Sequence, residues 1–438
     1  MHNSVFVPLS LSFLISTCVD FLSPNVNKVM KKFNVPVIYR SPLITAIKNK
    51  RREKDKLKKD FSPSFLDFGD VHIYLARHFG FCYGVENAIE ISFKTVEENP
   101  DKTIYLLSEM IHNPHVNDDL KERGVRFLMD TKGNTLIPFE SLLPGDIVVV
   151  PAFGTTLQIE EKLRKAGVEI EQYNTTCPFV EKVWNRAETI AKKNYTIIIH
   201  GKPQHEETRA TFSHSAVNSP TVVVKDMQEA MELAGYIKGT KDPKDFYREF
   251  AGQHTDGFDV KNHLQRIGVV NQTTMLASDT QGIADYLKSV MVTRYNLDDS
   301  SVSERFADTR DTLCYATNEN QGAVYALVDT PADFAIVVGG YNSSNTSHLV
   351  ELCEEKLPTY FIHSADEIIS SKEIRHYNLH KKKVVTSLSY LPEKKPVKVL
   401  ITSGASCPDA MVENVIMRLT EFYPSSKSVD EVMQEFNW

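Results

Sequence analysis

The sequence predicts an α/β protein built from three similar domains with mostly parallel sheets. From about Val71 onward, short β-branched runs alternate with amphipathic segments of about ten to sixteen residues, which is typical of parallel α/β units. Cys82, Cys177 and Cys314 each end an extended or loop segment and open a helical one, and this repeated setting indicates three related units. A chain of 438 residues has room for about three domains of ordinary size.

Strands and helices are expected to alternate along these units. Runs of β-branched and aromatic residues predict strands at 146–151, 195–200, 221–224, 267–270, 334–338 and 397–401. Apolar residues at helical spacing predict helices at 157–166, 181–193, 277–290 and 410–422. Between Gly235 and His263 the chain is polar and rich in Gly, Lys and Asp, so we interpret this stretch as a surface insertion in the middle domain.

These patterns divide the chain into an N-terminal extension, three domains and a tail. The boundaries are 1–70 for a partly disordered or helical extension, 71–176 for the domain with Cys82, 177–308 for the domain with Cys177 and the insertion at 235–263, 309–425 for the domain with Cys314, and 426–438 for the tail. A basic run from Lys48 to Lys59 contains acidic residues as well, so we interpret it as a solvated charged helix rather than as a membrane or nucleic-acid contact. We also hypothesise that Met30 is the true start and that residues 1–29 are an over-extended reading frame.

Composition excludes several classes of protein. Lys and Arg number 50 against 57 Asp and Glu, a formal net charge of −7, so no global charge favours nucleic acid or an anionic membrane. Every apolar run falls short of the roughly 18 residues that a membrane helix needs, and the stretch from Val5 to Val19 lacks the features of a signal peptide. Six widely spaced cysteines do not form a secreted disulfide framework. We therefore expect a cytoplasmic protein that binds neither nucleic acid nor membrane.

Three of the cysteines are candidates for a shared metal site. Cys82, Cys177 and Cys314 each stand where a helix begins, and a helix N-terminus favours the thiolate. Separations of 95 and 137 residues are too long for a zinc finger or a small ferredoxin, so these cysteines can meet only at the centre of three domains. The alternative is that each is a small buried hydrophobe. Cys18, Cys353 and Cys407 lack this setting, and we interpret them as structural or incidental.

Polar side chains follow the predicted strands in series. They occur at 200–208, 271–274, 339–345 and 402–406. Ligands of open parallel sheets bind beyond the carboxyl ends of the strands, and Ser, Asn, His and Gly at such ends suit a small phosphorylated ligand. Each set taken alone is also compatible with helix capping. Glu207 is a candidate proton donor if it lies in a water-poor cavity, and His112 is a candidate phosphate partner.

Taken together, the motifs resemble the IspH/LytB family of 4-hydroxy-3-methylbut-2-enyl diphosphate reductases. The resemblance runs from about Tyr74 to Tyr423. It rests on motifs that occur in the family's order: His-Phe-Gly-Phe-Cys-Tyr-Gly-Val at 78–85, Ile-His-Asn at 111–113, Thr-Cys-Pro at 176–178, His-Glu-Glu-Thr at 205–208, Gln-Thr-Thr at 272–274, Asp-Thr-Leu-Cys-Tyr-Ala-Thr at 311–317, Ser-Ser-Asn at 343–345 and Gly-Ala-Ser-Cys-Pro-Asp at 404–409.

The resemblance implies a trefoil of three α/β domains around a central [4Fe-4S] cluster. Cys82, Cys177 and Cys314 would hold three of its irons and leave the fourth open to the substrate's hydroxyl. Glu207 would supply protons, and Thr273 would orient the hydroxyl and relay them. The residues implied to hold the diphosphate are His112, His205, Ser343, Ser344, Asn345 and Ser406.

The implied activity is an oxidoreductase step of the methylerythritol phosphate route to isoprenoids. Two electrons and two protons would remove the substrate's hydroxyl as water and give isopentenyl and dimethylallyl diphosphate. A ferredoxin or flavodoxin type of donor is implied, because the cluster passes one electron at a time. One position departs from many members of the family: Phe153 stands where they carry a second diphosphate-contacting histidine, so no function is assigned to it.

Two other functions remain open from the residues alone. A zinc-dependent hydrolase or zinc structural protein would use the same cysteines with His112 or His205. A non-catalytic binding module would use the cysteines structurally and the Ser and Asn sets as helix caps. The sequence does not indicate an oligomeric state.

Overall fold

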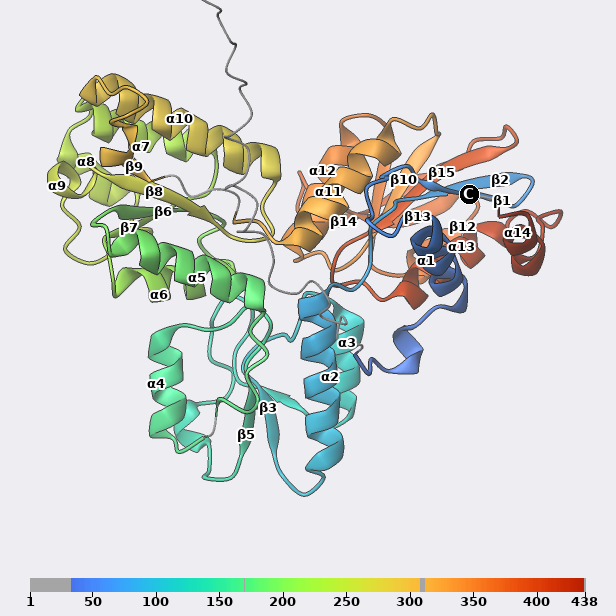
Figure 1. The fold of residues 1–438 in the computed structure, drawn as a ribbon. Helices are drawn as coiled ribbons and strands as arrows, with labels where there is room; N and C mark the ends of the chain where they lie inside the picture. Colours follow the sequence, from blue (N-terminus) through green and yellow to red (C-terminus); the bar gives the residue numbers. More distant parts are fainter. Residues whose placement is uncertain (1–32, 169, 308–311, 437–438) are drawn as a thin grey trace, which may run out of the picture. The chain divides into compact units, whose positions relative to one another are not determined.

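The described residues of the chain form three sheets, each with its own helices (Figure 1). The computed structural model describes residues 33–168, 170–307 and 312–436, and the chain from Val35 onward is one compact unit. Cys18, Met30 and the proposed over-extended frame at 1–29 lie outside the described residues. Within the described ranges, no helix has both the length and the apolar character required to cross a bilayer.

The first sheet is parallel, with strand order β4-β3-β5. Its strands are β3 (Ile104–Leu106), β4 (Arg126–Phe127) and β5 (Ile147–Val149). The helices of this unit are α2 (Tyr83–Glu98), α3 (Pro114–Glu122) and α4 (Leu157–Lys165), with a 3-10 turn at Phe139–Ser141. β3 and β5 are short runs rich in β-branched, aromatic and other apolar residues and are buried along their whole length, as expected for strands of a parallel sheet.

The second sheet is also parallel, with strand order β7-β6-β8-β9. Its strands are β6 (Thr196–His200), β7 (Thr221–Val224), β8 (Ile267–Asn271) and β9 (Phe306–Ala307). Its helices are α5 (Pro178–Ala191), α6 (Glu206–Ala216), α7 (Met227–Lys238), α8 (Pro243–Glu249), α9 (Val260–His263) and α10 (Ala277–Tyr295). The stretch expected as a surface insertion contributes to the core of the second unit, because Phe246, Phe250 and Phe258 are buried in one cluster with residues of its sheet, α7 and α10.

The third sheet has the order β1-β2-β15-β10-β11-β13-β12, with β14 paired to β13. Its strands are β1 (Ser64–Asp67), β2 (Val71–Leu75), β10 (Phe334–Val338), β11 (Thr359–Ile362), β12 (Ile368–Ser370), β13 (Glu373–Asn378), β14 (Lys383–Leu388) and β15 (Val397–Ser403). Its helices are α1 (Pro42–Lys54), α11 (Tyr315–Val328), α12 (Ser344–Glu354), α13 (Asp409–Thr420) and α14 (Val429–Glu435), and short 3-10 turns lie at Val37–Tyr39 and Ala365–Glu367. A further 3-10 turn at Val302–Glu304 precedes β9 of the second sheet. β2 pairs in parallel with β15, so residues expected to open the first domain complete the third sheet.

The three units repeat one arrangement, as the cysteine settings predict. In each, a helix that begins at a cysteine leads into a central strand, and the next two parallel strands lie on either side of it. The repeated orders are β4-β3-β5, β7-β6-β8 and β11-β10-β15. In all three, the loops that follow the central strand and its later neighbour gather at equivalent sheet edges. The prediction of an α/β fold with mostly parallel sheets is confirmed.

One expectation about the N-terminal region is wrong. The basic run was interpreted as part of a solvated helix ahead of the folded body, but α1 buries Leu43, Ile44 and Ile47 in the core of the third sheet. The reason is that these three residues precede the basic run at helical spacing and give the helix an apolar stripe. Arg51 is also buried, because its guanidinium donates to the carbonyls of residues 60 and 62.

Candidate functional site

The three candidate cysteines each occupy the residue at which a helix begins. Cys82 precedes α2, Cys177 precedes α5 and Cys314 precedes α11, and all three have extended backbone angles. Pro178 fits the first position of α5, where a missing N–H costs no hydrogen bond. The three side chains line a single cavity, so the helix starts of three different sheets meet there.

The same cavity collects every residue singled out from the sequence as a candidate ligand or catalyst. Besides the cysteines, it is lined by His112, His205, Glu207, Thr273, Ser343, Ser344, Asn345 and Ser406. These residues come from the loops that follow the central strands or their later neighbours, or from the first turns of the helices α6 and α12 that begin after such loops. The common topology of the units therefore brings together positions that lie up to 324 residues apart, from Cys82 to Ser406.

Burial, rather than the helix N-termini, dominates the acidity of the thiols. It raises the pKa of Cys82 to about 12 and that of Cys177 to about 11, although backbone N–H groups at both helix starts act in the opposite direction. Burial also raises the pKa of Cys314, against hydrogen bonds from Thr317. The helix starts act on Cys82 and Cys177 in the expected direction, but burial outweighs them and favours the protonated thiol in the absence of a cation.

The spacing of the thiols suits a group larger than one ion. Across the described ranges, no three side chains of His, Cys, Asp or Glu stand close enough together to bind a single metal ion. The three thiols nevertheless line one cavity. The sulfur of Cys177 fits beside Gly84 because glycine has no side chain: a Cβ at Gly84 would lie 2.6 Å from that sulfur. A tetrahedral zinc needs its ligands around one point, whereas an iron–sulfur cluster spreads its thiolates over several irons. The donor set fits the cluster better.

Glu207 lies beside this cavity and is tied to the loop before Cys314. Its side chain is 1% exposed, and the backbone N–H of Thr273 donates to its Oε1. The carbonyl of Thr273 in turn accepts from the N–H of Cys314 at 3.3 Å. Burial raises the pKa of Glu207 to about 7, against hydrogen bonds from Thr273 and the charge of His112. A carboxyl group with such a pKa can hold and donate a proton near neutrality.

Five buried polar atoms of the cavity have no hydrogen-bond partner within the described part of the chain. They are His112 Nδ1 and Nε2, His205 Nε2, Ser344 Oγ and Asn345 Nδ2. The Nδ1 of His205 accepts from the N–H of Glu207 at 3.2 Å, so the neutral ring carries its proton on Nε2. Burial and the nearby His112 lower the pKa of His205 well below its usual value. Because buried donors without partners are costly, these atoms indicate the place of a polar ligand.

His112 is held among aromatic and acidic neighbours. Its ring stacks on Phe153 with centroids 4.3 Å apart and meets the ring of His205 edge-on at 5.2 Å. Its Nδ1 lies 3.5 Å from the carboxylate of Glu109, and its Nε2 lies 3.6 Å from that of Glu206. Sequence reasoning missed Glu206, which is buried and accepts a hydrogen bond from Ser108. The only feature of the sequence that points to Glu206 is its position between His205 and Glu207.

The loops of the third sheet approach the site closely because two glycines allow it. A Cβ at Gly340 would lie 2.2 Å from the carbonyl oxygen of His112, and one at Gly404 would lie 1.9 Å from Oγ1 of Thr346. Ser406 Oγ donates to that same carbonyl of His112 at 3.1 Å. The first and third units are therefore held against each other at the cavity, through the backbone carbonyl of His112.

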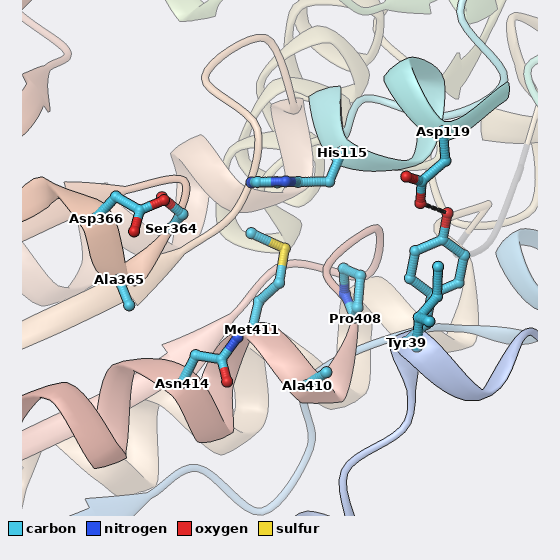
Figure 2. Close-up of a pocket in the computed structure, with 11 residues that line it drawn as sticks. Tyr39, His115, Asp119, Ser364, Ala365, Asp366, Pro408, Ala410, Met411 and Asn414 are labelled. Atoms are coloured by element: carbon cyan, nitrogen blue, oxygen red, sulfur yellow. Dashed lines mark hydrogen bonds between the residues drawn. The ribbon is translucent and has the colours of Figure 1, made fainter. Parts of the chain in front are cut away.

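A second pocket lies between the turn at 37–39, α3 and α13 (Figure 2). It is lined by His115, Asp119, Asp366 and Met411 among others, and Tyr39 donates a hydrogen bond to Asp119 at its edge. None of its polar lining atoms is a buried group lacking a partner among the residues that the structure describes. The cysteine cavity is therefore the candidate active site.

Comparisons with known proteins agree on one family. The family model described as LytB protein matches residues 73–420. The chain is 39% identical over 382 residues to the 4-hydroxy-3-methylbut-2-enyl diphosphate reductase of Picosynechococcus, covering 87% of this chain and 89% of the relative. It is 41% identical over 356 residues to the reductase of the same name from Prochlorococcus marinus, covering 81% and 85%.

A solved structure supports the fold. The E-1-hydroxy-2-methyl-but-2-enyl-4-diphosphate reductase from Plasmodium falciparum superposes with a TM-score of 0.56 at 22% sequence identity, covering 80% of this chain and 87% of that one. At this identity the likeness concerns the fold alone.

Proposed function

Because the chain belongs to the LytB family, we propose that it reduces 4-hydroxy-3-methylbut-2-enyl diphosphate to isopentenyl and dimethylallyl diphosphate. In this reaction the bond between carbon and the hydroxyl oxygen breaks, two electrons and two protons are taken up, and water leaves. The enzyme would act in the methylerythritol phosphate route to isoprenoids.

One observation carries the proposal: three thiols face the same cavity as a set of buried polar atoms that have no partner among the described residues. The thiols of Cys82, Cys177 and Cys314 would provide ligands for a [4Fe-4S] cluster, whose positive irons would favour the thiolate against the burial that raises the pKa of each thiol. When bound, the cluster would supply the electrons of the reduction one at a time, and its open iron would provide a Lewis acid.

The polar side of the cavity is suited to a diphosphate. Ser344 Oγ, Asn345 Nδ2 and the Nε2–H of His205 are donors that a phosphate oxygen would satisfy. Ser343 lies at the start of α12, whose free backbone N–H groups add to the attraction for an anion. We assign His112 and Ser406, which line the same wall, to diphosphate binding as well.

Glu207 and Thr273 are the proposed proton-handling residues. Hydroxide is a poor leaving group, so the C–O bond breaks more readily when the oxygen receives a proton. Glu207 is buried, and burial raises its pKa so that it holds a proton near neutrality. The backbone N–H of Thr273 fixes one oxygen of this carboxyl group, and we assign the hydroxyl of Thr273 to orienting the substrate's hydroxyl and relaying the proton.

We further propose a ferredoxin- or flavodoxin-type electron donor and a location in the cytoplasm. A site that needs three free thiols requires a reducing compartment, and all five cysteines in the described residues are free. We also propose the domain division at 71–176, 177–308 and 309–425, with the exception that β2 belongs to the third sheet.

The deciding experiment is a visible spectrum with iron and sulfide analysis on protein purified without oxygen. We expect a brown protein that dithionite bleaches, with about four irons and four sulfides per chain. Turnover of 4-hydroxy-3-methylbut-2-enyl diphosphate by the reduced protein should follow. A colourless protein with about one zinc per chain would instead favour the zinc hydrolase or zinc structural protein. A protein with neither metal, whose properties do not change in Cys82→Ser, would favour a binding module.

A further inference from the structure

Residues 37–61, which we call the N-terminal strap, precede the part of the chain that the family model matches. The strap contains the turn at Val37–Tyr39, helix α1 and the extended segment that follows. It begins beside α3, where Tyr39 donates a hydrogen bond to Asp119 (Figure 2). α1 then packs against α13, the helix that follows the Ser406 loop.

The strap contacts the loop before Cys82 at successive residues. At its start, the ring of Tyr39 meets that of Phe81 edge-on, with centroids 6.0 Å apart. At its end, the carboxylate of Asp55 lies 3.6 Å from the guanidinium of Arg77. The strap therefore spans the whole segment from 77 to 81, which leads directly into a proposed cluster ligand.

Residues after α1 hold the middle of the same loop. The ring of Phe61 meets that of His78 with centroids 5.4 Å apart. Lys58 and His78 both approach the carboxylate of Glu319 on α11, at 3.7 and 3.5 Å. Since α11 begins at Cys314, these contacts join the strap to the helix of a second proposed ligand.

Lys48 makes the central contact of the strap. Its ammonium group lies 2.7 and 2.9 Å from the two carboxylate oxygens of Asp409 and 3.1 Å from the carbonyl oxygen of Phe79, and it stands 4.5 Å from the centre of the Phe79 ring. Asp409 is the first residue of α13, three residues after Ser406. One side chain from the strap therefore joins the Cys82 loop to the Ser406 loop.

The backbone between these loops is built around this ion pair. Gly80 has a φ of +81°, and a Cβ there would lie 2.4 Å from Oδ1 of Asp409 and 3.1 Å from Nζ of Lys48. The N–H of Cys82 then donates to the carbonyl of Ala405 at 3.2 Å. The ion pair occupies the space beside Gly80, and the two loops pair with each other immediately after it.

From these contacts we infer that Lys48 is a positioning residue, through which the N-terminal strap fixes the Cys82 loop against the Ser406 loop. The inference rests on the proposed function only where it concerns the cluster. Lys48 touches neither the cavity nor its polar atoms, so its effect passes through Phe79, Asp409 and the backbone of Cys82.

The test compares Lys48→Ala, Lys48→Arg and Lys54→Ala in the full-length protein. Lys54 is an exposed lysine on the same helix and serves as the matched control. Amide hydrogen exchange over residues 77–82 measures how readily the Cys82 loop opens. The rate at which a chelator bleaches the visible absorbance measures how firmly the proposed cluster is held. We expect Lys48→Ala to speed both by about tenfold, because it removes a charged hydrogen bond and an ion pair. Lys48→Arg and Lys54→Ala should stay near wild type.

Equal exchange over residues 77–82 in Lys48→Ala and the wild type would overturn the inference. Faster exchange throughout the chain, together with a lower melting temperature, would also overturn it, because that result shows a general structural role. If Lys48→Ala does not fold, Asp409→Asn keeps the shape of the partner, removes its charge and should give the same local effect. Iron-free wild-type protein would count against the proposed function, and the exchange comparison alone would then decide the inference.

Discussion

Gly84 offers a test in which local geometry and helix propensity act in opposite directions. It is the second residue of α2, and a Cβ at this position would lie 2.6 Å from the sulfur and 3.1 Å from the Cβ of Cys177. Ordinary van der Waals contacts between carbon atoms lie at about 3.5–4 Å. The Gly84→Ala substitution therefore requires the thiol of Cys177 to move by about 1 Å or to rotate away from the cavity.

Such a displacement is large on the scale of metal coordination. Ligand distances in metal sites hold to within about 0.2 Å, so a thiol moved by about 1 Å no longer binds its iron. We expect metal affinity to fall at least by the about 10- to 100-fold that mutations of supporting residues cause. Alanine is a better helix former than glycine by about 0.5–1 kcal/mol, so the free energy of unfolding of the metal-free protein should stay level or rise.

The assay measures iron per chain after anaerobic reconstitution and the melting temperature of the metal-free protein. Gly282→Ala is the matched control, because Gly282 also lies within a helix and a Cβ there would meet only the end of Met227, at 3.5 Å. The control should keep its iron and gain up to about 1 kcal/mol of stability. Full iron content in Gly84→Ala would refute the reasoning, since Cys177 would then not hold the cluster in the geometry described here.

Further predictions concern the proton donor and the diphosphate site. Glu207→Gln should lower kcat by about 10²- to 10⁴-fold and leave iron content and KM unchanged, because an amide has a similar shape and cannot donate a carboxyl proton; near-normal turnover would remove Glu207 from this role. Wild-type kcat should fall as pH rises through about 7, because the protonated form of Glu207 is the donor and burial raises its pKa to about 7. The Glu207→Gln variant should not show this fall in kcat. Ser344→Ala should raise KM by about 10- to 100-fold, the effect of losing a hydrogen bond to a charged group. Its melting temperature should not fall, since the Ser344 hydroxyl is buried without a partner in the described residues; an unchanged KM would place the diphosphate elsewhere.

Local sequence signals were enough to predict that a helix begins at each of the three cysteines. Each cysteine follows an extended segment and precedes a run with helical periodicity, and the structure begins a helix at each. The acidity of the thiols could not be predicted in the same way. It depends on how deeply the cavity is buried, which is a property of the packing of three units and not of any helix start.

The contacts of the strap were also beyond sequence reasoning. Lys48 belongs to a run of mixed charges, and such runs are usually solvated. Its side chain is instead only 28% exposed, and its ammonium group is bound to Asp409, which lies 361 residues further along the chain. No periodicity in the sequence connects residues at that separation, so only the fold shows that a charged residue of the extension supports the site.

Helix capping and ligand binding were opposed interpretations of the polar sets, and the structure shows that one loop can do both. His205 caps α6 with Nδ1 and keeps Nε2 free, while Ser343 caps α12 and leaves the next hydroxyl, that of Ser344, without a partner in the described chain. The cap orients the loop, and the neighbouring atom faces the cavity. Because the three units share one topology, Phe153 follows β5 as Thr273 follows β8 and Ser406 follows β15. At that equivalent position the first unit presents an aromatic ring, which stacks on His112. We infer that the first unit contributes to the cavity by orienting His112 rather than by adding a second polar group.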